Sequence, residues 1–462
     1  MSDRKVRSLF RRPGTTDKPI HTSHHSMSGP PAPVGQVRRG RIGVLRPLGL
    51  RDFRLLWSGM TVSLLGDGIF TVALAWQVYE LSNVPTALSM VGVAWTLPMV
   101  LLLLVGGVAS DRYDRRKVLV FSDVVRGAAI LGAGILSVTG ALELWHMFVI
   151  AAMFGIGESF FGPAFGAIVP DIVPKHMLVE ANSLDQFVRP AGLYMLGPAV
   201  GGWMIGWWGP GAAFLADAGT FAVSAVCIAL IRPLPRASVE RSRPIKEIKE
   251  GVRFVRSETW LWATLCAASV SLLMFWGPLD VLLPFLVKNR LSGNATDLGL
   301  VFAVGGVGAL LAAFVMGQMG LPKRHVVFMY LCWTISIGSM VLFGFAWDLK
   351  LVYLARFLEG GLATAGMVVW GTMMHRLVPS ELLGRVSSVD WFISIGLVPV
   401  SFAFTGPVSE WIGVEATFIA AGVAGAVATI AFLFVPGIRD TERDGRMEEP
   451  QSLHAEEDQV VA

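Results

Sequence analysis

The chain has 462 residues, of which 53% are hydrophobic and only 16% are charged, and its formal net charge is +4. Soluble globular proteins carry about 25% charged residues, so this composition excludes an ordinary soluble protein. The three cysteines, Cys227, Cys266 and Cys332, lie far apart inside apolar runs, which argues against a disulfide framework or a cysteine metal site. We expect them to be small buried side chains.

The first 50 residues are polar, basic and rich in Pro, Gly and Ser. They contain no apolar run of the kind found in a cleavable signal peptide. We therefore expect residues 1–50 to form a disordered cytoplasmic tail. His21, His24 and His25 lie in this tail, and we expect them to be solvated rather than bound to a metal.

Twelve apolar runs follow, and each is long enough to cross a bilayer as a helix, because about 20 apolar residues suffice. We therefore predict an all-α polytopic membrane protein with twelve transmembrane helices. The predicted spans are residues 55–80, 86–109, 118–140, 145–169, 184–207, 212–231, 260–286, 297–319, 325–346, 350–371, 387–409 and 415–436.

The Lys and Arg residues are distributed very unequally between the two sides of these spans. With the N-terminus placed inside, 32 of the 38 lie on the inner side, three lie outside and three lie within spans. Short cytoplasmic loops of membrane proteins are rich in Lys and Arg. We therefore expect a multi-pass membrane protein with both termini in the cytoplasm.

Residues 232–259 separate two sets of six spans. Apolar residues at 245, 248, 252 and 255 keep helical spacing opposite a charged face, which predicts an amphipathic helix on the inner membrane surface. The predicted parts are a tail of residues 1–50, a six-helix bundle of residues 51–231, a cytoplasmic linker of residues 232–259, a second six-helix bundle of residues 260–436 and a cytoplasmic tail of residues 437–462.

The two sets of spans contain a repeat. Residues 173–187 align without gaps to residues 378–392, with six of 15 positions identical. Such a repeat predicts two pseudo-symmetric bundles with a pathway at their interface. In each copy we expect the proline to end one helix and a Ser–Asp pair, Ser183 and Asp185 in the first copy, to cap the next.

A charged turn, Gly-Gly-Val-Ala-Ser-Asp-Arg-Tyr-Asp-Arg-Arg-Lys of residues 106–117, lies between the second and third predicted spans. It matches the major facilitator superfamily motif Gly-x-x-x-Asp-Arg-x-Gly-Arg-Arg/Lys, with Asp114 in place of the usual second glycine. The matching residues are Gly107, Asp111, Arg112, Arg115 and Arg116. Over residues 50–436 the chain resembles this superfamily, and most of all its bacterial drug and siderophore exporters, which include enterobactin- and macrolide-efflux proteins. The resemblance implies a location in the bacterial inner membrane.

The resemblance implies that this turn is a conformational latch, which joins the two bundles when the cavity faces outward. Gly107 is expected to let two helices approach closely. Asp111 is expected to accept hydrogen bonds from a facing helix N-terminus or to pair with Arg115. Asp123 and Arg126 can extend this network, whereas the alternative is a charge cluster that only sets topology.

The fifth predicted span carries the motif Gly-x-x-x-x-Gly-Pro-x-x-Gly-Gly, formed by Gly192, Gly197, Pro198, Gly201 and Gly202. Small residues allow close helix packing, and we expect Pro198 to kink the helix. In the superfamily this motif is associated with proton-coupled exporters rather than importers. Ordinary packing glycines are the alternative.

Five carboxyl groups lie within predicted spans, at Asp67, Glu158, Asp217, Asp280 and Glu359. A charge at mid-bilayer costs at least about 2.5–3.5 kcal/mol, so such residues usually face a wet cavity or a partner. We predict proton coupling at Asp67 first and then at Glu158, with Asp280 and Glu359 as further candidates. Structural hydrogen bonds or ion pairs are the alternative for each.

Arg356 begins an Arg-x-x-x-Gly segment in the tenth predicted span, which resembles a superfamily pattern normally found in span four. The equivalent position of span four is Ala151, so the arginine that the superfamily links to proton handling is absent or displaced. Arg356 and Arg189 are the available partners if the carboxyl groups form structural ion pairs.

Aromatic side chains within the spans are candidates for a substrate-binding wall, because they bind apolar or cationic aromatic compounds by stacking and cation–π contact. Together with Arg356, the candidates are Trp76, Phe160, Phe161, Trp276, Trp370 and Trp391. Packing and interfacial anchoring are the alternative roles.

These features predict a secondary transporter, not an enzyme, that exports a small amphiphilic, drug-like compound in exchange for protons by alternating access. The sequence has no Gly-x-x-x-x-Gly-Lys-Ser/Thr loop, so ATP is not the expected energy source. The expected partners are the substrate, protons and the lipid bilayer, and we expect a monomer without cofactor, metal or nucleic acid. The alternatives are a siderophore or lipid-like exporter, a uniporter or importer of the same fold and, least of all, a polytopic membrane enzyme.

Overall fold

The computed structural model describes residues 43–233 and 244–445 of the chain. Within these two ranges the secondary structure is helical and contains no strand, which confirms the predicted all-α class. Helices are the expected outcome for long apolar runs, because a helix satisfies its backbone N–H and C=O groups within its own segment. The three histidines at positions 21, 24 and 25 lie outside the described residues.

The first described helix begins at Gly43, whereas the first bundle was predicted to begin at residue 51. The short helix there packs against α5 and α1, and Leu48 and Leu50 contact a buried cluster that contains Phe53 and Val173. The helices are η1 Gly43–Gly49, α1 Arg51–Leu81, α2 Pro85–Arg112, α3 Arg115–Val138, α4 Leu144–Ile172, η2 Lys175–Met177, α5 Leu178–Arg189, η3 Pro190–Leu196 and α6 Gly197–Ala229.

From residue 244 onward the chain is again helical. The helices are α7 Pro244–Ser257, α8 Thr259–Gly277, η4 Pro278–Leu282, α9 Leu283–Phe285, η5 Leu286–Arg290, α10 Ala295–Met319, α11 His325–Gly338, α12 Met340–Gly344, α13 Leu349–Leu377, α14 Ser380–Gly396, α15 Val398–Ile412, α16 Val414–Phe432 and α17 Asp440–Arg443. Part of the predicted C-terminal tail is therefore folded. Ile438 and Thr441 are buried, and the Glu442 carboxylate accepts a hydrogen bond from the Val327 N–H near the start of α11.

Eleven helical segments of the described chain are long and apolar enough to cross a membrane. One of them, Lys175–Ala229, has 55 residues and contains the fifth and sixth predicted spans. A straight helix of that length would be about 80 Å long, far more than the roughly 30 Å of a hydrocarbon core. Its backbone leaves the helical region at Gly209, where φ is 77° and ψ is 169°, and Pro210 follows. A positive φ suits glycine, because it has no Cβ to clash.

In the repeated loops, the prolines lie as predicted, but the helix after the first loop begins differently. Pro174 and Pro379 do follow the ends of α4 and α13, as predicted, since proline cannot continue a helix. Ser183, however, lies inside α5 and donates to the Val179 carbonyl, and Asp185 pairs with Arg189. The predicted capping by the Ser–Asp pair is therefore wrong, because α5 already begins at Leu178.

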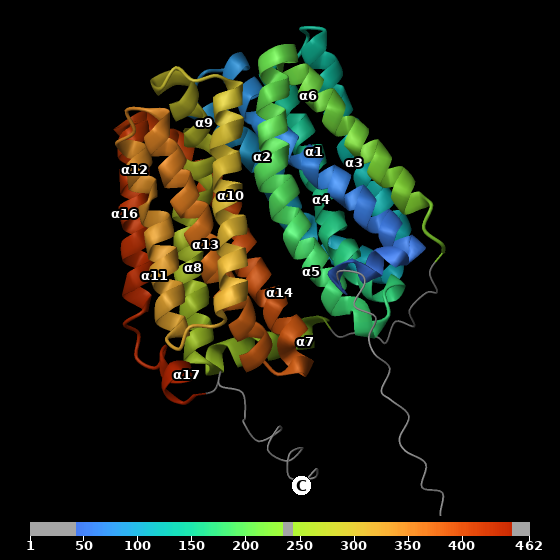
Figure 1. Cartoon of the computed structure of the whole chain (residues 1–462). Helices are drawn as coiled ribbons and strands as arrows, with labels where there is room; N and C mark the ends of the chain where they lie inside the picture. The colour runs from blue at the N-terminus through green and yellow to red at the C-terminus, as the bar shows by residue number, and fades with distance from the viewer. Residues whose placement is uncertain (1–42, 234–243, 446–462) are drawn as a thin grey trace, which may run out of the picture. The chain divides into compact units, whose positions relative to one another are not determined.

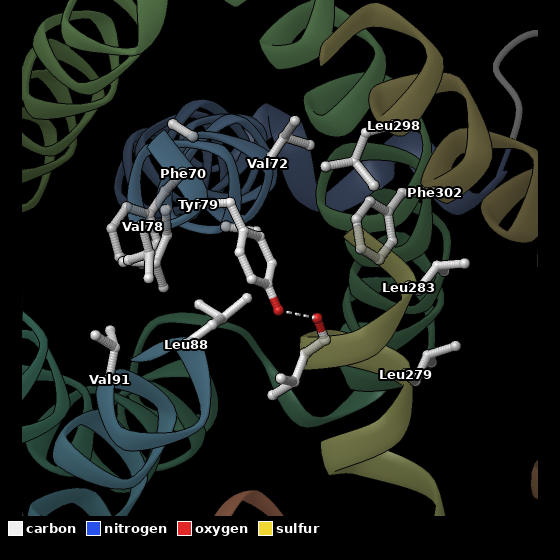
Figure 2. Close-up of a cluster of buried hydrophobic side chains, with 14 of the residues drawn as sticks. Phe70, Val72, Val78, Tyr79, Leu88, Val91, Leu279, Leu283, Leu298 and Phe302 are labelled. Carbon is white, nitrogen blue, oxygen red and sulfur yellow. Dashed lines mark hydrogen bonds between the residues drawn. The ribbon is translucent and has the colours of Figure 1, made fainter. Parts of the chain in front are cut away.

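Helices of each described range pack mainly on helices of the same range, and a few contacts join the two ranges. In the first part, α1 and α3 pack on α6, and α2 and α3 pack on α4; later in the chain, α10 and α11 pack on α13, and α16 packs on α8 (Figure 1). Contacts of α2 with α15 and of α6 with α10 connect the two groups. A buried cluster continues across this connection, with Phe70 and Leu88 on one side and Leu283 and Phe302 on the other (Figure 2).

Candidate functional site

The charged turn between α2 and α3 is anchored to neighbouring helices of the same part of the chain. The Asp114 carboxylate accepts a hydrogen bond from the Arg116 N–H and so caps α3, which explains why an aspartate can replace the motif glycine. The Arg115 side chain pairs with Asp171 at the end of α4 and donates to the Ala167 carbonyl. The Arg116 side chain donates to the Ile231 carbonyl at 2.8 Å, beyond the end of α6.

Two expectations for this turn need correction. The glycine that allows close approach is Gly106, where a side chain would collide with the Ser159 carbonyl, whereas a Cβ at Gly107 would meet only open space. Asp111 does not pair with Arg115, whose partner is Asp171; Asp111 and Arg112 are exposed. Within the described residues, the side chains of this turn make hydrogen bonds and ion pairs only to residues before 232.

The glycine motif lies where α6 begins and packs closely on two helices. A Cβ at Gly197 would lie 2.7 Å from the Gly68 Cα of α1, and one at Gly201 would lie 2.8 Å from the Ile69 Cα. A Cβ at Gly202 would lie 2.9 Å from the Gly299 Cα of α10. The motif therefore brings α6 against both α1 and α10 at backbone distance, as small residues allow in membranes.

Pro198 directly follows the π-helix η3, Pro190–Leu196, within one continuous helical segment. A proline lacks the N–H that would bond the preceding turn and its ring crowds that turn, so irregular backbone just before Pro198 agrees with the expected distortion. Two further π-helices, η4 and η5, interrupt the segment that α8 begins. Such π-helical turns occur frequently at functional sites. Here they carry Tyr194, Asp280 and Lys288.

A buried charge centre lies between α3, α4 and α6. Arg126 Nη2 donates to Asp123 Oδ1 at 2.7 Å, and the Ser224 hydroxyl of α6 donates to Asp123 Oδ2 at 2.6 Å. The Arg126 guanidinium lies 4.5 Å from the Phe161 ring centroid and 4.6 Å from that of Phe221, within cation–π range. This first charge centre is separate from the charged turn, so these residues do not extend a network from it as predicted.

Asp67 and Asp217 lie beside the first charge centre. Gly66 has no side chain, and any side chain there would collide with the Asp217 carboxyl and the Thr220 hydroxyl. The Asp217 Oδ1 accepts a hydrogen bond from that hydroxyl at 3.1 Å. Within residues 43–233 and 244–445, Asp67 Oδ1 and Asp217 Oδ2 are buried and have no hydrogen-bond partner. Two neighbouring helices of the described chain therefore each carry a buried carboxyl oxygen without a partner, and the two acids act on each other electrostatically.

Glu158 is half-buried on α4 and accepts a hydrogen bond from the Trp95 indole of α2 at 2.8 Å. Its charge, like those of Asp123 and Arg126, acts on Asp67. The predicted coupling candidates of the first part of the chain are thus electrostatic neighbours. Trp95 is not among the predicted aromatic candidates, because the sequence does not show which tryptophan of the spans faces an acid.

A second charge centre lies between α10 and α13. Arg356 and Glu359, one helical turn apart on α13, form a buried ion pair, and the guanidinium lies 5.6 Å from the Phe302 ring centroid. A side chain at Gly305 would collide with this guanidinium, so α10 leaves room for it. Asp280, half-buried in η4, interacts electrostatically with both charges of the pair.

Tyr194 of η3 is close enough to acids of both described ranges to interact with them electrostatically. Its side chain is 46% exposed, and Arg189, Asp280, Glu158 and Glu359 are the charges that act on it. A side chain at Gly306 of α10 would collide with the Tyr194 backbone, which places η3 directly on α10. One feature of the sequence could have pointed to Tyr194, because Pro190 and the motif glycines lie on either side of it.

One end of the connection between the two groups of helices is closed by polar contacts. The Tyr79 hydroxyl donates to the Val281 carbonyl at 2.6 Å (Figure 2), and the Lys288 ammonium donates to the Tyr79 carbonyl at 2.7 Å. The same ammonium lies 5.2 Å from the Trp76 ring centroid.

The amides of Asn83 and Asn289 complete these contacts by exchanging two hydrogen bonds of 2.7 and 3.0 Å. We refer to Trp76, Tyr79, Asn83, Val281, Lys288 and Asn289 together as the seam. The first three lie in the last turns of α1 or just beyond them, Val281 lies in η4, and the last two lie in η5. No residue of the charged turn belongs to the seam. Sequence reasoning missed the seam, because its members lie about 200 positions apart.

The predicted aromatic wall is not brought together as one surface. Trp370 is 6% exposed and its indole donates to Asp390, and Arg356 is 7% exposed in its ion pair, so neither is open to a ligand here. Trp76 belongs to the seam, and Phe161 lies under Arg126. The remaining candidates are the half-buried Phe160 and Trp276 and the exposed Trp391.

Within the described ranges, no three His, Cys, Asp or Glu side chains gather closely enough to hold a metal ion. The site chemistry of the described residues is instead that of carboxyl groups, arginines and aromatic rings within membrane-spanning helices.

Fold and site together define a multi-pass membrane transporter of the major facilitator type. Two solved structures illustrate the likeness of fold. The inward-open xylose transporter XylE from E. coli matches with a TM-score of 0.61 and 14% identity over 83% of this chain and 96% of that one. An inward-facing bacterial homologue of the iron transporter ferroportin matches with a TM-score of 0.64 and 16% identity over 83% of this chain and 98% of that one.

The family model of transmembrane secretion effectors matches residues 42–460. The chain belongs to this family of major facilitator transporters, and it is a transporter rather than an enzyme.

Several relatives of the chain are efflux proteins or exporters. The multidrug efflux pump Tap of Mycolicibacterium fortuitum is 27% identical over 84% of this chain and 96% of its own length. Macrolide efflux protein A of Streptococcus pyogenes is 23% identical over 80% of this chain and 92% of its own length. The enterobactin exporter EntS of Escherichia coli O139:H28 is 26% identical over 73% of this chain and 80% of its own length.

Proposed function

We propose that this chain exports small amphiphilic compounds with a cationic or aromatic part, in exchange for protons. One observation carries the proposal. Asp67, Glu158 and Asp280 are half-buried within membrane-spanning segments, whereas Arg126 and Arg356 are buried and paired with acids on their own helices. Arg189, a part-exposed cation of the same segments, also pairs with an acid, Asp185. Within the described residues, Asp67, Glu158 and Asp280 form no ion pair, so these acids suit both a proton and a cationic ligand.

The transport cycle follows from two six-helix bundles, residues 51–231 and 260–436, joined by the linker of residues 232–259. In this proposal the segment Lys175–Ala229 crosses the membrane twice, reversing at Gly209, which gives twelve spans. The bundles rock about their interface, so that the pathway opens to one side at a time. The repeat between residues 173–187 and 378–392 supports this arrangement.

The seam and the charged turn are the two alternating closures of this cycle. The seam joins the bundles at one end in this structure, while the charged turn keeps its contacts within the first bundle. With both termini in the cytoplasm, as the distribution of Lys and Arg favours, the seam lies outside and the turn inside. The structure then corresponds to a state closed to the outside.

Proton coupling takes place at Asp67, with Asp217 as its neighbour and Glu158, Asp280 and Glu359 as further sites. A carboxyl group in an apolar setting is more easily kept neutral than charged, since desolvation disfavours the charged form. Release of its proton requires contact with water or with a cation. A cationic substrate that approaches Asp67 would displace the proton, which is the elementary requirement for exchange.

The relatives support export at the level of a substrate class. Their names specify a multidrug pump, a macrolide efflux protein and an enterobactin exporter, which are chemically different cargoes. We therefore assign amphiphilic compounds rather than one molecule. The acids near the pathway favour a cation over an anionic siderophore, because like charges repel.

The decisive experiment reconstitutes the purified chain in proteoliposomes with an imposed pH gradient. A panel of lipophilic cations, macrolides and siderophores is offered, and movement of each compound is followed together with internal pH. We expect the cations to move against their gradient as protons move the other way. Transport that ignores the pH gradient would point to a uniporter, and transport restricted to siderophores would replace the proposed substrate class.

A further inference from the structure

A cavity of about 530 Å³ lies away from both charge centres, between α7, α8 and α14. Its walls are Trp262, Leu265, Cys266 and Ser269 of α8, Ile393 of α14, and Val255 and Arg256 at the end of α7. Small-molecule sites typically measure on the order of 300–1,000 Å³, so the volume is sufficient for part of a lipid.

The cavity has a preformed frame. α7 packs against both α14 and α8 (Figure 1). Glu250 of α7 pairs with Arg385 of α14, and a Cβ at Gly251 would lie 3.0 Å from the Arg385 carbonyl oxygen. The two helices are therefore held together by an ion pair and a backbone contact beside the cavity.

The four α8 residues lie on one stripe of the helix. Positions 262, 265, 266 and 269 recur at helical spacing, and the stripe extends about 10 Å along the axis at 1.5 Å per residue. Trp262 begins it near the start of a membrane-spanning segment, where tryptophan commonly lies at the membrane interface. The cavity thus runs from the interface toward the hydrocarbon.

The single cation of the wall is Arg256, at the junction of α7 and α8. Its side chain is exposed and, within the described residues, has no hydrogen bond or ion pair. The cavity therefore has a positive charge at its interface end and an apolar wall beyond it. This arrangement is complementary to a lipid with an anionic headgroup and an apolar tail.

We propose that this cavity binds an anionic phospholipid from the leaflet on the α7 side, with its phosphate at Arg256 and an acyl chain along the α8 stripe. Basic pockets between membrane helices bind anionic headgroups in this way, and charge complementarity selects such a lipid over a zwitterionic one. The proposal goes beyond transport and does not depend on which compound is carried.

Cys266 provides a direct readout, because it is the exposed cysteine of the described chain and lines the cavity. The purified full chain is placed in nanodiscs of phosphatidylcholine alone or with phosphatidylglycerol. Alkylation of Cys266 by a maleimide is followed by peptide mass spectrometry, and retained lipid is counted by native mass spectrometry. We expect phosphatidylglycerol to slow alkylation and to be retained.

The matched variants are Arg256→Ala and Arg253→Ala. Arg253 is also exposed on α7, one turn earlier, and does not line the cavity. We expect Arg256→Ala to weaken phosphatidylglycerol binding about fivefold, the effect of one interfacial cation. Arg253→Ala should leave it unchanged, and Arg256→Lys should retain most of it.

Three results would overturn the proposal. The first is equal protection of Cys266 by phosphatidylcholine and phosphatidylglycerol. The second is an equal loss of binding in the two alanine variants, which would indicate a diffuse attraction to the helix surface. The third is protection of Cys266 by a transported compound but not by lipid, which would make the cavity part of the transport pathway. Thermal unfolding of each variant in detergent confirms that the comparison is made between folded proteins.

Discussion

Arg126 and Arg356 each form a buried ion pair of the same kind. The helices that carry them, α3 and α13, are not related to each other by the sequence repeat. Each arginine pairs with an acid one turn away on its own helix, Asp123 on α3 and Glu359 on α13. The 205-residue offset of the repeat relates Arg356 instead to Ala151 of α4, which is buried in an apolar cluster.

The two ion pairs differ in the aromatic rings and hydroxyl groups that surround them. The first charge centre has two phenyl rings within 4.6 Å and a hydroxyl from another helix, whereas the second has one ring at 5.6 Å. The sequence repeat therefore does not extend to the charge centres. Each centre neutralises its arginine within one helix, so the two centres can be perturbed one at a time.

The largest expected effect is on stability when one partner of a buried pair is removed. Arg126→Ala leaves Asp123 charged and unpaired, which costs about 3–5 kcal/mol. Arg356→Ala should cost less, because its guanidinium has fewer aromatic contacts to lose. Thermal unfolding in detergent measures both variants. The double variant Asp123→Ala with Arg126→Ala should recover much of the loss, and an equal loss in single and double variants would contradict the explanation.

The next largest effect concerns the Ser224 hydroxyl, which bonds an acid of the first charge centre and, among the described residues, has no counterpart in the second. Ser224→Ala removes the hydrogen bond to Asp123 Oδ2, and a bond to a charged group contributes about 1.5–3 kcal/mol. Unfolding temperature should fall, though less than for Arg126→Ala. Ser183→Ala is the control, since that exposed hydroxyl bonds only to its own helix. Similar losses in the two variants would show that Ser224 has no special role.

A functional comparison uses the acids beside each centre. Asp67→Asn should lower pH-driven transport at least about tenfold, equivalent to about 1.4 kcal/mol, because it removes the proposed proton site. Asp280→Asn should lower it less. Proteoliposome transport with and without a pH gradient measures both, and Asp52→Asn at the start of α1 is the control. Full proton-driven transport by Asp67→Asn would exclude this residue as the carrier.

The smallest effect concerns the seam. Asn83→Ala removes two exposed amide hydrogen bonds, each contributing about 0.5 kcal/mol, so the seam should open about fivefold more often. Accessibility of a cysteine placed at position 281 reports this opening. Asn289→Ala should have the same effect, and the double variant should add nothing further. Additive effects of the two changes would show that the amides act independently.

Part of the site could be predicted because it follows from local chemistry. The intramembrane acids were recognised as isolated charges in apolar runs, and the glycine motif as close packing. The charged turn was recognised too, but its details were not: Gly106 rather than Gly107 touches a helix, and Arg115 finds Asp171. Neighbouring glycines look alike in sequence, and only the structure shows which of them faces the adjacent helix.

The aromatic candidates show the limit of single-residue reasoning. Trp370 and Trp391 look alike in sequence, yet one is buried in a cluster with Trp260 and the other is 63% exposed. The hydropathy of a span describes the average environment of its residues, and not which face of the helix each residue occupies. A ligand-binding wall depends on those faces.

Local sequence determines that this chain is helical, lies in a membrane and carries acids within its spans, because hydrophobicity and charge act on each segment separately. Tertiary structure alone decides which charges neutralise one another and which remain available. Ser224 reaches Asp123 from another helix, and Tyr79 reaches Val281 across about 200 residues of chain. Such contacts depend on distances between helices, which no local pattern encodes.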